Sequence, residues 1–456
     1  MEQHQALPNT ALGKLVEEAG ISAVGLARRI QDIGTEWGHE VYTSHTQVGR
    51  WLRGQQPRDP TPALIAEALS RKLGRRVTLG DIGMDAAGCF SPELGLGFAA
   101  RPDDAVQTLT DLWKADVQRR SFLTSSVSAT ALSEPTLAWL LARPADLEHS
   151  RGTTHVGMTD VHAVASTAAA FAELDHRYGG GTARTAAIQY LTDQVDPMLH
   201  GSYSDKVGKE LFAVVVEFTK RVAWMSYDSG HHNLGRRYFI TALSLAHHSG
   251  DRLLGASVLS AMSHQANYLG ESRSAVHLAR AARNGVEPCS SASAMANFAA
   301  MEARAAAAMG ERSEALTALA DAEAAFERRD PEHDPAWIAF FDPSEMADEV
   351  AHCLRDLGDY PRARQAAEEC LDLAGPGRAR SRVFSQVVLA ESWLGAGEPE
   401  EAARIGLQVV PQVAELHSVR VAAYLRTLRK SVQPYEALPP VAEFAHSADR
   451  VLSSRP

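Results

Sequence analysis

Five glycines recur at a nearly constant interval in the second half of the chain, and this repeat constrains the fold more than any other feature. The glycines are Gly230, Gly270, Gly310, Gly358 and Gly397, with spacings of 40, 40, 48 and 39 residues. Small residues recur at three fixed offsets from these glycines. Seven positions before the glycines the chain has Ala223, Ser263, Ala303, Ala351 and Ala390, and five positions after them it has Gly235, Ala275, Ala315, Ala363 and Ala402. Twelve positions after the glycines it has Ala242, Ala282, Ala322, Cys370 and Val409. Glycine commonly turns the chain after a helix, and small side chains let helices approach closely. The pattern therefore predicts a series of helical hairpins.

The composition favours the same fold class for the whole chain. Aromatic residues make up 7% and apolar residues 45% of the sequence, and alanine, the strongest helix former, is common. Because 456 residues exceed one ordinary core, we expect more than one domain. The hairpin pattern is similar to tetratricopeptide-like repeats, although these repeats are longer than the usual length of about 34 residues. We therefore expect an all-α fold whose residues 159–456 form a tetratricopeptide-like α-solenoid.

Helical segments also flank the five predicted hairpins. An earlier hairpin is expected in TDVHAVASTAAAFAELDHRYGGG and TARTAAIQYLTDQVDPML, and a final pair in SVRVAAYLRTLRK and VAEFAHSADRVL. We expect these segments to cap the two ends of the array. Residues 85–158 are predicted to be a partly helical connector, in which Trp113, Trp139 and Leu140 dock onto a neighbouring domain.

The N-terminal residues 1–84 carry the signals of several short helices. Asn9 or Thr10 can cap a helix over residues 9–19, and Ser22 can cap a second helix that Gly34 is expected to end. Ser44 can cap a third helix, SHTQVGRWLRG, in which Val48, Trp51 and Leu52 face inward. A fourth follows at TPALIAEALSRKLG.

The third helix has a polar outer face suited to nucleic acid. Thr46, Arg50 and Arg53 lie opposite its apolar stripe, with His45 and Gln47 near its first turn. Residues 44–58 contain three arginines and no acidic residue, as expected of a helix that approaches phosphates. A second basic cluster is expected at Arg71, Lys72, Arg75 and Arg76. The alternative is a small helical bundle with a solvated arginine face.

Charge is divided unevenly along the chain, whose net charge is −11. Residues 1–82 contain 10 Lys and Arg against 9 Asp and Glu, which leaves 35 against 47 for the remainder. The acidity therefore lies outside the N-terminal unit, and an acidic repeat array would repel DNA and confine contact to that unit.

The segment HTQVGRWLRGQQPR, with TPALIAEALSRKLGRRVTLGDIGM after it, resembles the helix-turn-helix domains of Cro/CI-type (XRE) regulators of actinomycetes. AELDHRYGGG and YDSGHHNLGRRYFITALSLAHHSGD resemble the repeat regions of such regulators. The resemblance implies that residues 1–84 are a helix-turn-helix domain. It implies that contacts to DNA involve Ser22, Ser44, His45, Thr46, Gln47, Arg50, Arg53 and Arg58. The link between the second and third helices is lengthened here by QDIGTEWGHEVY, which can reorient the reading helix or add contacts.

A solenoid offers a concave groove lined by the first helix of each hairpin. Counting back from the turn glycines places a polar and aromatic set there: Lys220, Trp224, Tyr227, His264, Asn267, Tyr268, Asn297, Arg304, His352 and Arg355. Asparagine amides can bond a peptide backbone, and arginine can hold a carboxylate. The alternative for each residue is an ordinary solvated position, so the groove is a hypothesis about the group.

The remaining candidate motifs predict no catalytic, metal or cofactor site. Gly179–Gly181 lack the Lys-Ser/Thr continuation of a phosphate loop and are predicted to form a turn, and the pairs His231–His232 and His247–His248 lack a metal-ligand set. No nucleophile or dinucleotide motif is present, so we expect no enzyme and no cofactor. Four scattered cysteines, the absence of a bilayer-spanning run and an N-terminus unlike a signal peptide favour the cytoplasm.

Together these features predict a transcription regulator, a homodimer that binds an operator in double-stranded DNA. A peptide, a small molecule or a protein bound to the repeats would modulate its DNA affinity. Dimerisation is expected because one small module contacts few phosphates, so that specific binding normally requires two half-sites. The alternative is a protein-interaction scaffold whose N-terminal domain does not bind DNA.

Overall fold

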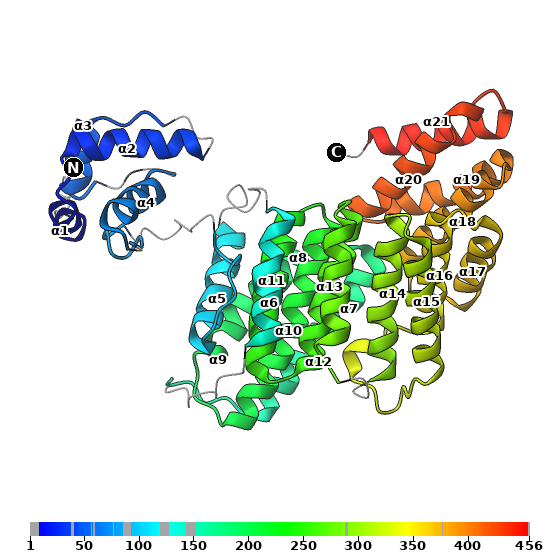
Figure 1. Ribbon diagram of the computed structural model, residues 1–456, viewed down its shortest axis with the longest axis horizontal. Helices are drawn as coiled ribbons and strands as arrows, with labels where there is room; N and C mark the ends of the chain where they lie inside the picture. The colour runs from blue at the N-terminus through cyan, green and yellow to red at the C-terminus, as the bar shows by residue number, and fades with distance from the viewer. Residues whose placement is uncertain are drawn as a thin grey trace. The chain divides into compact units, whose positions relative to one another are not determined.

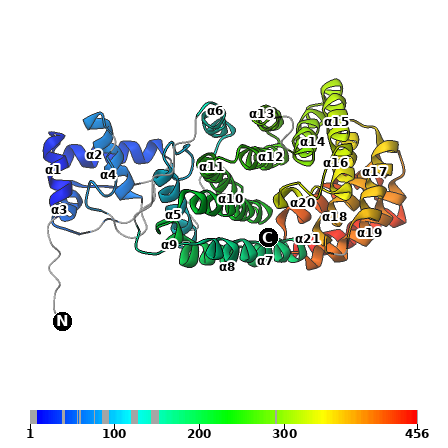
Figure 2. The same ribbon diagram turned by 90° about the horizontal axis from the view of Figure 1, so that it is seen from below.

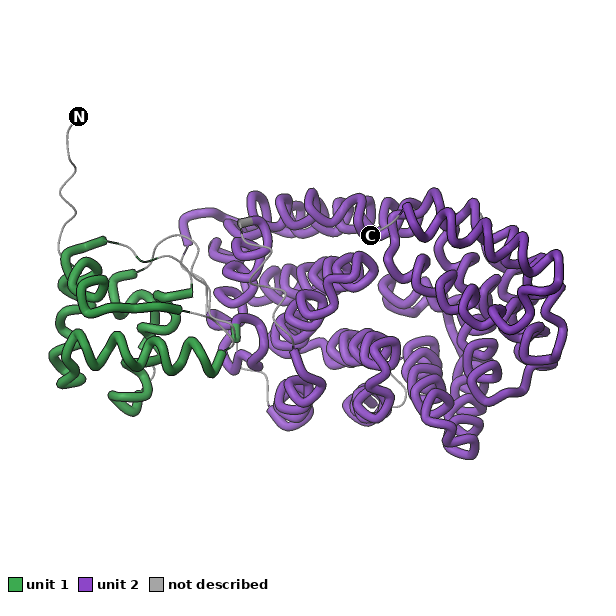
Figure 3. Tube along the Cα trace, turned by 90° about the horizontal axis from the view of Figure 1, so that it is seen from above, with its two compact units in different colours: residues 1–93, 118–122 green, residues 94–117, 123–456 purple. Residues whose placement is uncertain are grey.

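The computed structural model describes residues 9–37, 41–55, 57, 60–75, 77–84, 93–118, 127–142, 152–287, 291–375 and 377–454. The chain forms two compact units (Figure 3). Unit 1 comprises residues 1–93 and 118–122, and unit 2 comprises residues 94–117 and 123–456. The predicted all-α fold is confirmed, since the described residues form helices and no β-strand, apart from one isolated bridge between His155 and Ser202.

Unit 1 contains α1 (Thr10–Glu18), α2 (Ala23–Glu36), α3 (His45–Leu52) and α4 (Thr61–Leu73), as Figure 1 shows. Their apolar faces meet in one core, in which Leu12, Leu26, Ile30, Val48 and Leu64 are fully buried. The caps fall where the sequence predicts them: Asn9 caps α1, Ser22 caps α2 and Ser44 caps α3. Burial of the apolar stripes is the principal stabilising term for a unit of this size.

One boundary in unit 1 differs from expectation. Helix α2 continues to Glu36, so the prediction that Gly34 ends the helix is wrong. A glycine inside a helix is less favourable than alanine by about 1 kcal/mol. Burial of Ile33 and the hydrogen bond from the Thr35 hydroxyl to the Gln31 carbonyl offset that cost. The polar connection to α3 is therefore shorter than the sequence suggests.

Unit 2 begins with α5 (Pro102–Gln118), a 3₁₀ turn (Ala129–Leu132) and α6 (Ser133–Leu141). The two tryptophans of this region are fully buried. The ring of Trp139 is stacked under the Arg252 guanidinium, 3.8 Å from the ring centroid, and a β-carbon on Gly255 would collide with it. Asp116 of α5 is paired with Arg184 at 2.6 Å. The described helices of residues 85–158 thus pack on the helical array.

Five consecutive helical hairpins follow. They pair α10 (Asp205–Asp228) with α11 (His232–Ser249), α12 (Arg252–Tyr268) with α13 (Ser272–Asn284), α14 (Ala292–Ala308) with α15 (Arg312–Glu327), α16 (Pro343–Asp356) with α17 (Tyr360–Leu373), and α18 (Ala379–Gly395) with α19 (Pro399–Glu415). A 3₁₀ turn (Ala336–Ile338) precedes α16. Each predicted turn glycine joins the two helices of a hairpin with a positive φ between 74° and 88°. The small residues at the three recurring offsets are all buried, which confirms the repeat register.

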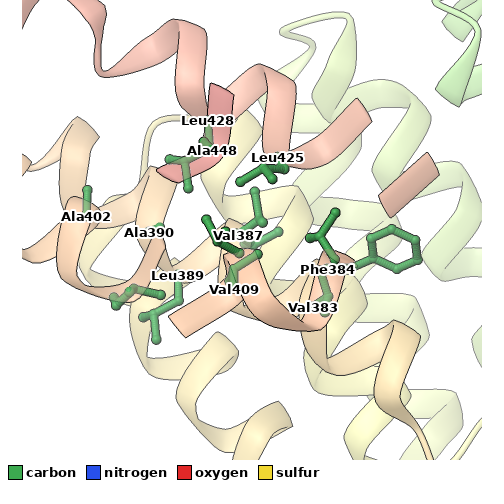
Figure 4. Packing of buried hydrophobic residues seen from close by; sticks show 14 of the residues in the cluster. Val383, Phe384, Val387, Leu389, Ala390, Ala402, Val409, Leu425, Leu428 and Ala448 are labelled. Carbon is green, nitrogen blue, oxygen red and sulfur yellow. The ribbon is translucent and has the colours of Figure 1, made fainter. Parts of the chain in front are cut away.

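The flanking segments are helical too. Before the hairpins come α7 (Met158–Tyr178), α8 (Gly180–Tyr190), a π-helical segment (Leu191–Val195) and α9 (Asp196–Leu199). After them come α20 (Val419–Ser431), a 3₁₀ turn (Gln433–Tyr435) and α21 (Pro439–Ser453). Leu425 and Leu428 of α20 and Ala448 of α21 pack with Val387 and Val409 in one apolar cluster (Figure 4). This cluster anchors the last two helices to α18 and α19.

The two ends of the helical array meet. The His417 N–H donates to the Tyr178 carbonyl at 3.0 Å, and the Gly181 N–H donates to the His417 carbonyl at 3.4 Å. Helix α7 also contacts α18, and in Figure 2 α7 leads towards the orange and red helices at the C-terminal end of the chain. We call this contact between the α7–α8 turn and residues 417–420 the closure. The flanking segments therefore contact each other, and unit 2 is a superhelix closed upon itself.

Buried ion pairs reinforce the closure. Arg380 donates to Asp175 and to Asp228, both at 3.1 Å, and the two carboxylates are 0% and 1% exposed. Asp228 also accepts from the Ser418 hydroxyl at 2.8 Å and from the Gly180 N–H at 3.1 Å. Although burial opposes ionisation, Arg380 and Arg221 hold the pKa of Asp175 below its usual value. The closure thus joins residues up to 205 positions apart through charged groups.

No helix in the described part of the chain is both long and apolar enough to cross a bilayer.

Candidate functional site

The first candidate site is the exposed face of α3 in unit 1. The Ser44 hydroxyl accepts from the Gln47 N–H at 3.4 Å, while Gln47 Oε1 accepts from the Ser44 N–H at 2.8 Å. This reciprocal capping box fixes the start of the helix. Val48 and Trp51 are buried beneath it, so the rotation of α3 about its axis is set by the core. The first turn and its outer side chains therefore have a defined orientation.

Four of the predicted DNA-contacting residues are exposed on this helix and its C-cap: His45, Thr46, Arg50 and Arg53. Within the described residues, neither Arg50 nor Arg53 makes an ion pair, and α3 contains no carboxylate. Ser44 and Gln47 are exposed as well, but their side chains are engaged in the capping box. The outer face of α3 thus presents two unpaired guanidinium groups.

The other residues predicted to contact DNA are not on α3. The Ser22 hydroxyl accepts from the Gly25 N–H at 3.1 Å and serves as the cap of α2. Arg58 and Arg76 lie outside the described residues. In the second basic cluster, Arg71 is paired with Glu36 and Glu67, and Arg75 with Glu18. Two of its cations are therefore neutralised within unit 1, which the sequence pattern did not indicate.

The second candidate site lies on the inner side of unit 2. The first helices of the hairpins pack side by side, and side chains of α20 reach four of them. The Tyr424 hydroxyl lies 3.2 Å from His352 Nε2 on α16, and its ring is 4.6 Å from that of Phe384 on α18. Arg420 lies over Tyr227 of α10 and Tyr268 of α12. Helix α20 thus occupies part of the concave side that the sequence analysis assigned to a ligand.

A cavity of about 150 Å³ remains beside α20. It is lined by His264, Asn267 and Tyr268 from α12, Met301, Arg304 and Ala308 from α14, Arg355 and Asp356 from α16, and Tyr424 from α20. Five of the ten predicted groove residues line it: His264, Asn267, Tyr268, Arg304 and Arg355. The helices that supply them are inner helices of three successive hairpins.

The other five predicted groove residues support their neighbours. Trp224 and Tyr227 pack in an aromatic cluster with His264, at centroid distances of 5.0 and 5.9 Å. His352 bonds Tyr424, and Asn297 accepts from the Ser260 hydroxyl at 2.7 Å. Lys220 donates to the Ser257 hydroxyl at 2.8 Å and lies over the Trp337 ring.

Charged groups around the cavity are organised in pairs. Arg304 is 3.0 Å from Glu349, Arg355 is 2.8 Å from Glu391, and His352 is 3.2 Å from Asp348. Although burial and Arg304 oppose protonation, the Asp348 carboxylate raises the pKa of His352 to about 9. His352 is therefore charged at neutral pH.

The nearby cations also shift the pKa values of two other titratable groups in the cavity wall. Burial lowers the pKa of His264 well below its usual value, and Arg420 and Arg304 lower it further, so His264 is neutral. Burial alone would raise the pKa of Tyr424, but His352, Arg304, Arg355 and Arg420 lower it. These cations therefore favour the ionised form of Tyr424 more than burial disfavours it.

Sequence reasoning missed Tyr424, Met301, Ala308, Asp356 and Arg420 at this site. Met301, Ala308 and Asp356 lie on the same inner helices as the predicted groove residues, at other offsets from the turn glycines. Tyr424 and Arg420 belong to α20, which was expected to cap the array. The segment VRVAAYLRTLRK, with one tyrosine and four basic residues, carries no local pattern that indicates their role.

The remaining motifs have structural partners. Of the three glycines predicted to form a turn, only Gly179 lies between α7 and α8, with φ +90°, whereas Gly180 and Gly181 are the first two residues of α8. His247 and His248 are buried, and His248 Nε2 lies 2.9 Å from the Ala99 carbonyl. Among the described residues, no group of three or more His, Cys, Asp or Glu side chains could hold a metal ion.

Comparison with known proteins adds one match. A family model described as the SP15 N-terminal domain matches residues 12–85, which correspond to most of unit 1. No curated protein matches the chain. The matched residues lie within unit 1, and the description of the family model contains no statement of activity.

Proposed function

We propose that the protein is a sequence-specific DNA-binding transcription regulator that reads DNA with α3 and acts in the cytoplasm, on the nucleoid. The observation that carries the proposal is the outer face of α3, where Arg50 and Arg53 are exposed and make no ion pair with the described residues. Arginine can contact phosphate, and it can bond guanine bidentately in the major groove. The resemblance of HTQVGRWLRGQQPR to Cro/CI-type domains supports the same function.

Charge distribution agrees with this function. Residues 1–82 carry 10 basic against 9 acidic side chains, and the remainder carries 35 against 47. The acidic remainder would repel the phosphate backbone, which leaves unit 1 as the DNA-contacting part. A homodimer would place two copies of α3 at half-sites about 34 Å apart, as specific recognition by small modules requires.

Selection from a random double-stranded DNA pool, with the full chain as bait, tests the proposal. We expect one sequence class to be enriched, with two half-sites. Arg50→Ala combined with Arg53→Ala is expected to abolish enrichment. The matched control is Arg426→Ala combined with Arg450→Ala, which removes two exposed arginines from α20 and α21 of unit 2. If no sequence is enriched, the alternative of a protein-interaction scaffold is favoured.

Unit 2 is proposed to regulate this DNA binding without catalysing a reaction. The supporting observation is the cavity beside α20, which is lined by arginine, asparagine, histidine and tyrosine side chains. Because α20 reaches across the inner helices, we favour a small molecule over an extended peptide or a protein segment in this space. A bound molecule changes DNA affinity only if it prefers one arrangement of the protein. The test is titration of the selected DNA with and without the ligand.

A further inference from the structure

The lengthened link between α2 and α3 still brings the start of α3 back beside α2. Part of the added sequence continues α2 to Glu36. The Gln31 side-chain amide then donates to the Thr43 carbonyl at 3.1 Å, which ties α2 to the chain just before the Ser44 cap of α3. Exposed side chains on this side of α2 therefore adjoin the first turn of α3.

Arg28 stands on this side of α2. It precedes Gln31 by three residues, a spacing that places two side chains on the same face of a helix. The Arg28 side chain is exposed, and within the described residues it makes no ion pair and no hydrogen bond. Asp32, four residues later, is exposed as well and does not pair with it. Arg28 therefore presents an unpaired guanidinium near the start of α3.

The neighbouring Arg29 lies on another side of the same helix. Successive residues of an α-helix are rotated by about 100°, so Arg29 shares its side with Glu36, seven residues later. Glu36 is paired with Arg71 of α4 at 2.7 Å. Arg29 thus lies on the side of α2 that faces α4, whereas Arg28 lies on the side that is bonded to the start of α3.

Tyr42 is a second exposed group at the start of α3. Burial alternates along the residues that lead into the helix, as it does in an extended chain. Val41 packs against the core of unit 1, Tyr42 is 84% exposed, and Thr43 is only 8% exposed. Tyr42 makes no hydrogen bond with the described residues. Its hydroxyl is therefore available to an outside partner two residues before the Ser44 cap.

These groups fit a partner with closely spaced negative charges. Arg28, Arg50 and Arg53 are exposed cations that pair with no carboxylate of the described residues. Arginine and tyrosine side chains are common donors to DNA phosphates. When the second helix of a helix-turn-helix pair enters the major groove, the first helix crosses the sugar-phosphate backbone. A cation on α2, beside the first turn of α3, is therefore placed to meet a phosphate at the edge of that groove.

We propose that Arg28 and Tyr42 extend the DNA-contacting surface of unit 1 beyond α3. The Arg28 guanidinium binds one phosphate at the edge of the groove that α3 enters, and the Tyr42 hydroxyl donates to another phosphate at the same edge. This inference rests on the proposed function and adds two backbone contacts to it. Phosphate contacts fix the position of a reading helix and carry no sequence information directly. The lengthened link thus adds contacts that hold α3 in place.

Fluorescence anisotropy of the full chain with a duplex selected from the random pool, over a series of salt concentrations, tests the role of Arg28. Arg28→Ala removes an exposed charge that has no partner in the described residues, and alanine favours a helix. We expect the association constant to fall by about tenfold or more, because a hydrogen bond to a charged group is lost. The slope of log K against log salt concentration should become shallower by about 0.9. Arg29→Ala is the matched control and should leave both quantities unchanged.

Tyr42→Phe tests the second contact in the same assay. The substitution removes only the hydroxyl and keeps the ring. We expect the association constant to fall severalfold, while the salt slope stays equal to that of the wild type because no charge is removed. Selection repeated with either variant should enrich the same sequence class as the wild-type chain, since both residues contact phosphates.

Four results would overturn the inference. If Arg28→Ala binds like the wild type while Arg50→Ala combined with Arg53→Ala abolishes binding, the proposed function stands and the contact from Arg28 is wrong. Equal losses in Arg28→Ala and Arg29→Ala would indicate general charge attraction instead of a placed contact. Unchanged affinity in Tyr42→Phe would exclude the second contact. If the wild-type chain binds no duplex, the proposed function and this inference fail together.

Discussion

Replacing Arg380 with glutamine should destabilise the closure of unit 2 strongly. Arg380 is the cation that joins Asp175 to Asp228, with three N–H···O contacts of 3.1 to 3.3 Å. Removing one partner of a buried ion pair costs about 3–5 kcal/mol, because a buried charge is left uncompensated. Here Asp175 keeps Arg221 at 3.7 Å, and Asp228 keeps the Ser418 hydroxyl. We therefore expect the lower end of that range, about 3 kcal/mol.

Hydrogen exchange followed by mass spectrometry provides the assay. The His417 and Gly181 amides donate hydrogen bonds across the closure, so their exchange reports its opening directly. In Arg380→Gln we expect faster exchange in peptides covering both amides. The control is Arg404→Gln, which breaks an exposed pair with Glu401 and should leave both amides unaffected. Unchanged protection in Arg380→Gln would refute the role assigned to the buried ion pairs.

The pH dependence of the closure follows from the same groups. The folded state lowers the pKa of Asp175 below its usual value of about 3.9. Its ionised form therefore stabilises the folded state at neutral pH, and this contribution is lost as the pH falls through the folded-state pKa. Arg380→Gln should reduce the contribution, so the variant should lose less stability than the wild type on acidification.

Three further perturbations test other parts of the structure. Gly180→Ala would place a β-carbon 2.7 Å from the Met225 carbonyl oxygen, so we expect urea denaturation to show a free energy of unfolding lower by about 1–3 kcal/mol. The control is Gly375→Ala, whose β-carbon would meet no atom within 4 Å and which should leave the free energy of unfolding unchanged. Leu425→Ala removes a fully buried side chain from the cluster that anchors α20 and should reduce the free energy of unfolding by about 2–5 kcal/mol, with a loss below 1 kcal/mol contradicting its packing. The folded state raises the pKa of His352 to about 9, whereas the unfolded pKa is about 6.5. The charge of His352 therefore stabilises the protein fully below pH 6.5, and this contribution disappears as the pH rises through 9. His352→Gln should flatten the dependence of stability on pH between these two values, and an unchanged slope would refute the His352–Asp348 pair.

The repeat register was predictable from sequence because it depends on local chemistry. Each turn glycine adopts a positive φ, and each small residue at the recurring offsets is buried between neighbouring helices. Because such contacts recur between residues close in sequence, the glycines and small residues recur at a regular spacing along the chain. Gly34 shows the limit of local rules, because tertiary burial of Ile33 extended α2 through a residue that usually ends a helix.

The closure and the site of Arg420 were not predictable in the same way. Arg380 meets Asp175 across 205 positions of sequence, and Ser418 meets Asp228 across 190. Nothing in a local pattern distinguishes Arg420 from the exposed Arg426 of the same helix. Only the return of α20 to the inner helices buries Arg420 among the aromatic rings. The basic cluster of Arg71 and Arg75 is a related case, since its acidic partners come from α1, α2 and α4.

The salt dependence of DNA binding tests the central claim, recognition of DNA by α3, most directly. Fluorescence anisotropy with a selected DNA duplex would give the association constant of the full chain over a series of salt concentrations. Each phosphate contact contributes about −0.9 to the slope of log K against log salt concentration. If Arg50 and Arg53 both contact phosphate, their joint replacement with alanine should make the slope shallower by about 2. If either reads a base, affinity should also fall by about 1–3 kcal/mol. An association constant and a slope that both equal those of the wild-type chain would contradict the claim.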